Sequence, residues 1–385
     1  MNRVTLFRTT PRIVFGSGAI NQLPSEIKSL GGGKVFLITD KGIVNAGLAR
    51  KITDLLDNAK IKYSVFDAVE PDPRYEIVEK TLRILREEKT DLVLGLGGGS
   101  SIDIAKTTAA LGLNRGPVSQ YFGIDLIPKA GLPSIIIPTT AGTGSEVTPI
   151  AILSDEKEKL KKGIVSSHLF PSIALLDPDL TIGLPPNITA STGMDALIHA
   201  IEAYTSVNAT SLTDLLAYRA MELLYQNIRA AYANGSNLEA RSAMLEGSLL
   251  AGMAFANAGV TAVHAFAYPI GAEFHIPHGV ANTLMLPHVM RFNLLGNVPK
   301  FARIAAAFGI PSAGMTILTM AEKAVEAIER LADDLKVPRH LKEFGIRQEH
   351  IPQLAEGVMK VTRLLANNPR TLTLQDAQEI YKAAL

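Results

Sequence analysis

The chain has 385 residues, of which 47% are hydrophobic, and it carries 38 Lys and Arg against 37 Asp and Glu. This length predicts roughly two to three domains with real cores. The balanced charge has no long block of one sign, which excludes a nucleic-acid-binding tail and a basic membrane-surface helix. Zero cysteines exclude disulfides, thiolate metal ligands and cysteine nucleophiles, so any metal must be bound by His, Asp or Glu. We expect small-molecule partners, no nucleic acid and no membrane.

Residues 1–18 contain no apolar stretch of the kind found in secretory signals. No later run reaches the roughly 18 apolar residues that a membrane span needs. Together these observations predict a cytoplasmic protein.

In the first half of the chain, short apolar runs alternate with amphipathic helical patterns. Strands are expected at KVFLIT (34–39), IKYSVF (61–66), DLVLG (91–95), SIIIP (134–138) and SIALLD (172–177), and helices near 43–59 and 75–88. Apolar strands between helices indicate a parallel sheet covered on both faces, an α/β Rossmann-like fold. The charge run DEKEKLKK (155–162) predicts a solvated hairpin or loop tip.

After GLPPN (183–187) the pattern changes to long helices rich in Ala, Leu and Met that continue to the last residue. We therefore predict a dinucleotide-binding α/β domain over residues 1–185 and an all-helical domain over residues 186–385.

The stretch GLGGGSSIDIAK (95–106) places glycines between a buried strand and a helix. Bare backbone at Gly97, Gly98, Gly99 and Ser100 can approach a pyrophosphate, and the helix N-terminus favours its negative charge. The spaced G-x-G-x-x-G fingerprint is absent, so this turn alone supports phosphate binding and a plain tight turn equally.

Two further features favour a nucleotide. The loop PTTAGTGSE (138–146) combines three threonine hydroxyls with two glycines, a composition suited to a ligand's phosphates or sugar. Asp40 closes the strand KVFLIT, where a carboxylate accepts from a ribose 2′-hydroxyl and repels a 2′-phosphate. The simpler interpretations are a helix N-cap for Asp40 and an ordinary polar loop for the threonines. Together the three features predict NAD rather than NADP.

Four residues of the second half are candidate metal ligands. Asp195 and His199 stand four apart on a predicted helix and so share one face. His264 lies in a strongly apolar stretch, where an unpaired imidazole is costly, and His278 follows a turn. Taken singly, a satisfied core histidine or a first-turn aspartate explains each of them better. As a set they suit Fe2+, Zn2+ or another divalent transition metal with a position left open for substrate.

With these residues in hand, the sequence resembles the iron-containing (group III) alcohol dehydrogenases over essentially its whole length. The resemblance rests on GGGSSIDIAK (97–106), PTTAGTGSEVTP (138–149), GMDALIHAIEAY (193–204) and HAFAYPIGAEFHIPHGVANTLMLPHVM (264–290). It implies NAD or NADP on an α/β domain, a divalent metal, usually iron, on a helical domain, a cleft between them, and a homodimer or larger homo-oligomer.

Carried over residue by residue, the resemblance implies metal ligands and cofactor contacts. The implied metal ligands are Asp195, His199, His264 and His278. The implied cofactor contacts are Asp40, Gly97, Gly98, Gly99, Ser100, Asp103, Thr139, Thr140, Thr143, Lys162 and Phe255.

The chain departs from the family pattern at two places. Tyr268 stands where many relatives have a second histidine, which affects the expected proton relay because a phenol is a poor proton acceptor at pH 7. Asp72 stands where many have an asparagine that contacts the cofactor. His275 matches no ligand position, and we expect a partly exposed loop residue or, alternatively, a member of the proton path.

These observations predict a metal-dependent, NAD-linked alcohol dehydrogenase or aldehyde reductase acting on a primary alcohol or diol. The metal would be a Lewis acid at the substrate oxygen, and nicotinamide would exchange the hydride. The alternatives are a glycerol-type polyol dehydrogenase, a lyase resembling dehydroquinate synthase that uses NAD transiently, and an NAD-binding sensor whose metal is only structural. Glu202, one turn after His199, is expected behind a metal ligand or on the surface.

Overall fold

The computed structural model describes residues 4–156 and 160–385, and this part of the chain divides into two compact units. The first unit is Thr9–Ile182, and the second is Gly183–Leu385 together with residues 4–8. Residues 4–8 thus lie outside the first unit, although the predicted first domain, 1–185, includes them. They join the second unit because the Arg8 N–H donates to Asn257 Oδ1 (2.7 Å) and the Arg8 carbonyl accepts from Asn257 Nδ2 (2.9 Å). The division into domains 1–185 and 186–385 stays a prediction.

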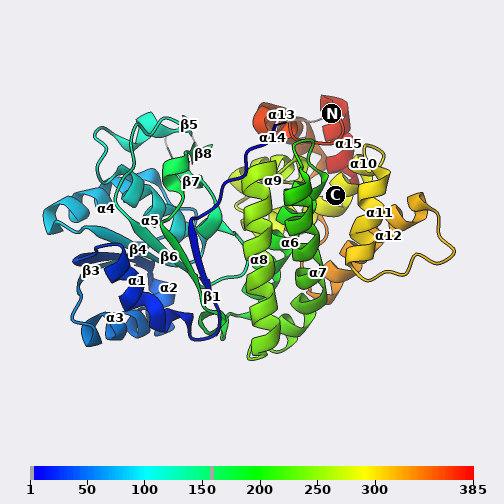
Figure 1. The fold of residues 1–385 in the computed structure, drawn as a ribbon. Coiled ribbons are helices and arrows are strands. Elements are labelled where there is room, and N and C mark those ends of the chain that lie inside the picture. The colour runs from blue at the N-terminus through cyan, green and yellow to red at the C-terminus, as the bar shows by residue number, and fades with distance from the viewer. Residues whose placement is uncertain (1–3, 157–159) are drawn as a thin grey trace. The chain divides into compact units, whose positions relative to one another are not determined.

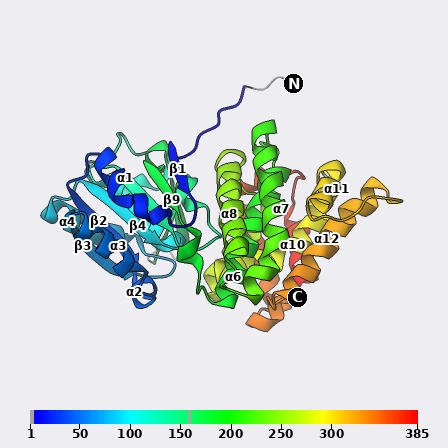
Figure 2. The ribbon, with the colours of Figure 1, turned by 60° about the horizontal axis from the view of Figure 1, so that its bottom comes forward.

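The first unit is built on a six-stranded parallel sheet with the strand order β1-β9-β6-β4-β2-β3 (Figures 1 and 2). The strands are β1 (Arg12–Phe15), β2 (Lys34–Asp40), β3 (Lys62–Val69), β4 (Leu92–Gly97), β6 (Ser134–Pro138) and β9 (Ile173–Leu176). The predicted apolar runs are the strands, which confirms the α/β class. Since β6, β4 and β2 are neighbours and parallel, their carboxyl ends meet at one edge of the sheet.

Alternating side chains of these strands build one core on each face of the sheet. Phe36 and Ile38 of β2 pack in the cluster formed with α4 and α5, whereas Val35 and Leu37 pack in the cluster formed with α1 and α3. The helices of this unit are α1 (Leu23–Ser29), α2 (Lys41–Asn45), α3 (Leu48–Asn58), α4 (Tyr75–Glu88) and α5 (Gly99–Leu111). Burial on both faces explains why the strands are continuously apolar.

Two local features refine the sequence prediction. The helix expected near 43–59 is split into α2 and α3, because Gly47 between them adopts a left-handed conformation with φ of 75°. The charge run at 155–162 joins β7 (Ile150–Asp155) to β8 (Leu160–Val165), which pair antiparallel and form a small sheet with β5 (Gly123–Ile124). The predicted hairpin is therefore confirmed for the described residues, while 157–159 lie outside them.

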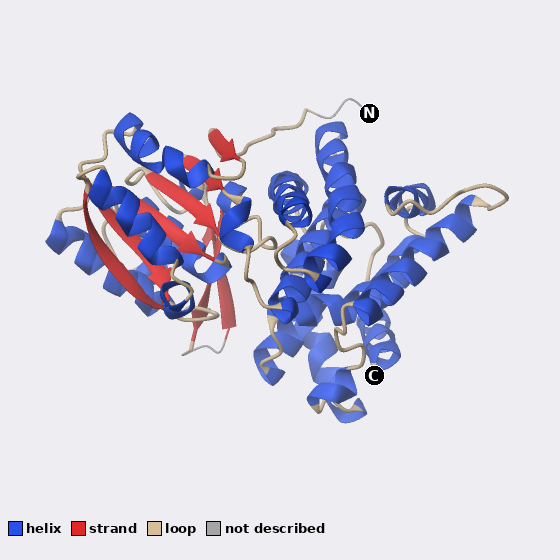
Figure 3. Cartoon of the chain, turned by 90° about the horizontal axis from the view of Figure 1, so that it is seen from below, coloured by secondary structure: helices blue, strands red, loops and turns tan. Residues whose placement is uncertain are grey.

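The second unit is helical, and its described residues contain no strand (Figures 2 and 3). Its helices are α6 (Pro186–Thr205), α7 (Ser211–Ala233), α8 (Leu238–Ala258), α9 (Ala262–Phe274), α10 (His278–Leu294), α11 (Val298–Ala307), α12 (Ile317–Asp334), α13 (Ile351–Lys360), α14 (Thr362–Leu365) and α15 (Leu374–Ala384). Helix α6 packs against α7, α8 and α10, and α9 packs against α10 and α13. The side chains of α6 are buried from Gly193 to Thr205, so polar groups on this stretch must find partners inside the unit.

No helix among the described residues has by itself the length and apolar character to cross a membrane. The bent pair α8 and α9 meets that test together, by length and composition only.

Candidate metal centre and cofactor site

The helix α6 presents three buried polar side chains on one face. Asp195, His199 and Glu202 follow one another at helical spacings of four and three, and all three are at most 6% exposed. The first turn of α9 brings His264 to this face. One ligand atom from each of Asp195, His199 and His264 lies within 4.8 Å of the other two, so one ion can bind all three residues.

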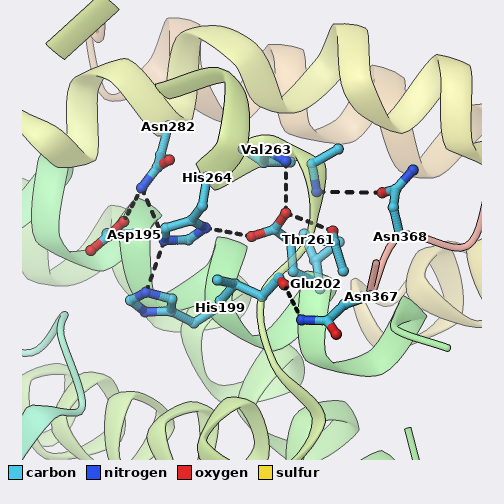
Figure 4. A network of polar contacts seen from close by, with 12 residues as sticks. Asp195, His199, Glu202, Thr261, Val263, His264, Asn282, Asn367 and Asn368 are labelled. Carbon is cyan, nitrogen blue, oxygen red and sulfur yellow. Dashed lines mark hydrogen bonds and ion pairs between the residues drawn. The ribbon is translucent and has the colours of Figure 1, made fainter. Parts of the chain in front are cut away.

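His278, the first residue of α10, lies beside this group. Its Nε2 is 3.9 Å from Asp195 Oδ1, and its ring centroid is 5.3 Å from that of His264. The Nε2 atoms of His199 and His264 lie 3.1 Å apart. The structure therefore brings together all four residues predicted as metal ligands, from three different helices. Figure 4 shows Asp195, His199 and His264 of this group.

Glu202 contacts His264 at the ring nitrogen that does not face His199. Its Oε1 accepts from Thr261 Oγ1 (2.7 Å) and from the Val263 N–H (2.7 Å), and its Oε2 contacts His264 Nδ1 (Figure 4). Because a carboxylate only accepts, Nδ1 must carry the proton, and Nε2 is left to face Asp195 and His199. Glu202 thus fixes the tautomer in which His264 can bind a metal.

Asn282, one turn after His278, occupies the middle of the cluster. Its Nδ2 donates to Asp195 Oδ1 (2.8 Å) and contacts His264 Nε2 (3.2 Å) and His278 Nε2 (3.1 Å). Its Oδ1 is buried without a hydrogen-bond partner among the described residues. One donor group therefore faces three atoms that would bind a cation. The donor set of one carboxylate and three imidazoles fits Fe2+ or Zn2+.

The pKa values of the cluster reflect its charges. Burial acts to raise the pKa of Asp195, but His199, His278 and His264 and the Asn282 amide outweigh it, so this pKa is lowered. Burial acts to lower the pKa of His264, but the Glu202 carboxylate outweighs it, and this pKa is raised. Asp195 is consequently anionic at neutral pH and supplies the negative charge of the donor set.

Three other residues discussed in the sequence lie around this cluster. The Phe255 ring of α8 stacks on His199, with centroids 4.3 Å apart, so within its unit this predicted cofactor contact packs on a candidate ligand. The Tyr268 ring lies 6.2 Å from His278, and burial raises the pKa of its hydroxyl. His275 is exposed at the end of α9 with φ of 54°, in agreement with the expected loop residue.

Glu202→Gln is expected to weaken metal binding by about 10- to 100-fold, the usual effect of removing a carboxylate behind a metal-bound histidine. The glutamine NH2 group would face a donor, either His264 Nδ1 or the pair from Thr261 and Val263. Competition with a chelator measures the affinity. Glu239→Gln, on the exposed first turn of α8, is the matched control and should keep it. Equal affinities in the two variants would contradict this role of Glu202.

Asp40 lies at the end of β2, at the edge where the carboxyl ends of β2, β4 and β6 meet. Its Oδ1 accepts from the Ile43 N–H (3.0 Å) and caps α2, so the simpler interpretation as an N-cap describes one of its contacts. Its Oδ2 accepts from Ser101 Oγ (2.9 Å) on α5. Asp40 thus links the end of β2 by a hydrogen bond to the start of α5, beside Gly97, Gly98 and Gly99, which we call the glycine turn.

The glycine turn leaves backbone exposed to a ligand. Gly97 has φ of 147°, and a Cβ there would lie 2.8 Å from the Ser101 Cβ and 3.1 Å from Asp40 Oδ2, so only glycine fits. Helix α5 begins at Gly99, and no side chain caps its N-terminus at Gly98. The first turn of α5 therefore offers N–H groups and the positive end of the helix dipole to an anion.

The loop PTTAGTGSE (138–146), which we call the threonine loop, follows β6 at the same edge. A Cβ at Gly98 would lie 3.6 Å from Thr140, and one at Gly99 would lie 2.9 Å from Thr143 Cγ2, so the loop packs directly on the glycine turn. Thr139 Oγ1 is buried without a hydrogen-bond partner among the described residues. A cradle without Cβ atoms, an uncapped helix and an unpartnered hydroxyl fit the phosphates and sugar of a dinucleotide.

Three other predicted cofactor residues are engaged by protein groups. Asp103 Oδ1 and Oδ2 accept from Ser145 Oγ (2.6 Å) and the Ile152 N–H (2.9 Å), so its carboxylate faces the interior of the unit. Lys162 Nζ pairs with Asp155 Oδ2 (2.9 Å). The side chain of Asp72 is exposed and accepts from Lys161 Nζ (2.6 Å).

Sequence reasoning missed Asn282 and left two roles open for Glu202. Asn282 has the same signal that identified Asp195 and His199, a polar residue four positions from a candidate ligand on one helix. For Glu202 the structure decides between the two roles, since the side chain is 1% exposed and bonded to His264.

Comparison with known proteins covers both units. The family model "Iron-containing alcohol dehydrogenase" matches residues 10–178, and the model "Fe-containing alcohol dehydrogenase family, C-terminal" matches residues 189–385. The chain is 42% identical to the long-chain-alcohol dehydrogenase 1 of Geobacillus thermodenitrificans (strain NG80-2), over 97% of this chain and 96% of that protein.

Two solved structures are similar over the whole chain. One is 1,3-propanediol oxidoreductase, with 41% identity, a TM-score of 0.97 and 100% of both chains covered. The other is the sulfoacetaldehyde reductase from Bifidobacterium kashiwanohense in complex with NAD+, with 31% identity, a TM-score of 0.89, and 100% of this chain and 99% of that chain covered. With these matches, the chain belongs to the iron-containing alcohol dehydrogenase family and is an alcohol or diol oxidoreductase that uses NAD and Fe2+.

Proposed function

We propose that Asp195, His199, His264 and His278 bind the catalytic iron, and that the edge formed by Asp40, the glycine turn and the threonine loop binds NAD in preference to NADP. The observation that carries the metal assignment is the convergence of Asp195, His199 and His264 within 4.8 Å in a buried part of the helical unit. Burying a carboxylate and several imidazoles together costs free energy unless a bound cation interacts with these groups. Zn2+ is the alternative ion, because the same donor set accepts it.

Each residue has a separate task in this reaction. When bound, iron supplies Lewis-acid activation of the substrate oxygen, and NAD accepts or donates the hydride. Asp195 contributes the negative charge that balances the cation, and Glu202 keeps the proton of His264 on Nδ1. Asp40 accepts from the ribose hydroxyls and repels a 2′-phosphate. Tyr268 is protonated near neutral pH, so it can donate a proton but cannot readily accept one.

For the substrate we propose a terminal alcohol or diol and the corresponding aldehyde. The relatives support this class by their names, which refer to long-chain alcohols, to 1,3-propanediol and to sulfoacetaldehyde. A cytoplasmic location and a homo-oligomer stay predictions from the sequence.

The test is an NADH-linked assay with a panel of primary alcohols, diols and glycerol, using protein purified without oxygen and analysed for metal. We expect stoichiometric iron and net NADH formation with at least one primary alcohol or diol. Preference for glycerol would favour the polyol dehydrogenase alternative. Turnover without net NADH would favour a lyase such as a dehydroquinate synthase relative, and no turnover with any substrate would favour a sensor.

A further inference from the structure

Two charged residues of α5, Asp103 and Lys106, form hydrogen bonds with the threonine loop. Asp103 accepts from Ser145 Oγ (2.6 Å) through Oδ1 and from the Ile152 N–H (2.9 Å) through Oδ2. Lys106, one turn further along α5, shares Ser145 as a partner. Ser145 belongs to the threonine loop (138–146), so both side chains connect α5 to that loop.

Lys106 is among the largest fully buried side chains of the chain, with 1% exposure. Its Nζ donates to the Ser145 carbonyl (2.9 Å), Ser145 Oγ (3.0 Å), Thr148 Oγ1 (3.2 Å) and the Ile150 carbonyl (2.6 Å). Burial lowers its pKa to about 8, against the opposing effect of the Asp103 and Glu146 carboxylates. The amine therefore remains mainly protonated at pH 7, and a buried cation with four oxygen partners holds this segment firmly.

A short series of contacts leads from these residues to the cofactor cradle. The Ser145 N–H donates to Thr143 Oγ1 (3.3 Å). Thr143 Cγ2 in turn lies 2.9 Å from the position that a Cβ of Gly99 would take. Thr143, which packs on Gly99, is thus connected by a hydrogen bond to Ser145.

We propose that Asp103, Lys106 and Ser145 form a buried clamp that fixes the threonine loop against the glycine turn and so preorganises the site for the cofactor pyrophosphate. This inference rests on the proposed binding of NAD at these two loops. The clamp residues are positioning residues, since both oxygens of Asp103 and the ammonium of Lys106 are satisfied by the protein. Preorganised loops bind more tightly because no ordering cost remains to be met on binding.

The experiment compares Ser145→Ala with Thr81→Val in the iron-loaded enzyme. Ser145→Ala removes the hydroxyl shared by Asp103 and Lys106. Thr81→Val is the matched control, because it removes another buried hydroxyl that bonds to α5, through Thr108 Oγ1 (2.6 Å), away from both loops. The dissociation constant of NADH is measured by the fluorescence of NADH itself, since the chain has no tryptophan to serve as an energy donor.

We expect Ser145→Ala to raise the dissociation constant of NADH and the KM for NAD by about tenfold, the size of one hydrogen bond to a charged group. The kcat at saturating NAD and the iron content should stay within about twofold of wild type. Thr81→Val should lower the melting temperature but leave NADH binding unchanged. In a double-mutant cycle with Asp103→Ala, the effects on NADH affinity should not add, because both changes break the hydrogen bond between Ser145 Oγ and Asp103 Oδ1.

Gly99→Val separates failure of the clamp from failure of the cofactor assignment. Its side chain would enter the cradle against Thr143, so it should abolish NADH binding if the cofactor lies there. Loss of NADH binding in Gly99→Val with wild-type affinity in Ser145→Ala would overturn the clamp alone. Wild-type affinity in both variants would overturn the clamp together with the proposed cofactor site.

Discussion

His264→Ala is expected to lower bound iron and to reduce alcohol oxidation by about a thousandfold or more. His264 is the residue on which the centre converges, with Nε2 beside His199 and Asn282 and Nδ1 held by Glu202. Loss of a Lewis acid removes several kcal/mol of stabilisation from the transition state, and about 4 kcal/mol corresponds to a thousandfold change in rate. Iron content and kcat/KM measured on the same sample give the result.

NADH affinity of the His264→Ala variant is expected to stay within about twofold of wild type, since the proposed cofactor residues belong to the first unit. His275→Ala is the control. It removes an exposed histidine from the same stretch of sequence, and it should keep both iron and activity. Loss of iron in His275→Ala, or full activity of metal-free protein, would show that the ligand set is wrongly assigned.

Asp40→Gly is expected to reduce the preference for NAD over NADP by about a hundredfold or more. Asp40 stands at the sheet edge beside the glycine turn, where its carboxylate would meet the 2′-phosphate of NADP as a like charge. Juxtaposed like charges cost several kcal/mol, and each 1.4 kcal/mol is a factor of about ten in affinity. The ratio of kcat/KM for the two cofactors measures the preference.

Asp40→Asn separates charge from capping. Its amide oxygen can still accept from the Ile43 N–H at the start of α2, so the helix cap is kept while the negative charge is lost. Asp40→Gly should also lose a few tenths of a kcal/mol of stability with the cap. We expect both variants to accept NADP. A wild-type enzyme that prefers NADP, or an unchanged ratio in both variants, would refute the role given to Asp40.

The sequence predicts the sheet edge well because each of its parts is a local pattern. A buried strand followed by a turn-forming residue identifies Asp40, Gly97 and the threonine loop, and parallel strands bring such ends together. What the sequence could not show is which oxygen each side chain faces. Asp103 is the example, since its place in the motif suggested a cofactor contact, whereas the structure directs its carboxylate to Ser145 and Ile152.

The metal cluster was only partly predictable from local sequence patterns. Helical spacing alone places Asp195 and His199 on one face, but no periodicity connects them to His264 or His278, which follow more than 60 residues later on other helices. Their ligand chemistry as a set suggested one metal site, and the family resemblance linked these segments to it. Neither helical spacing nor the family resemblance led us to Asn282. An asparagine on an apolar helix looks like an ordinary buried polar residue until its neighbours are known.

The most direct test of the metal assignment is an anomalous diffraction map, recorded at the iron absorption edge, from crystals of protein loaded with iron without oxygen. We expect one strong peak bound by Asp195, His199, His264 and His278. Glu202 should remain bonded to His264 Nδ1, and the Asn282 amide should move away from the two imidazole nitrogens that it contacts here. An iron peak at any other set of residues, or no peak at this cluster in protein that oxidises alcohol, would contradict the metal assignment.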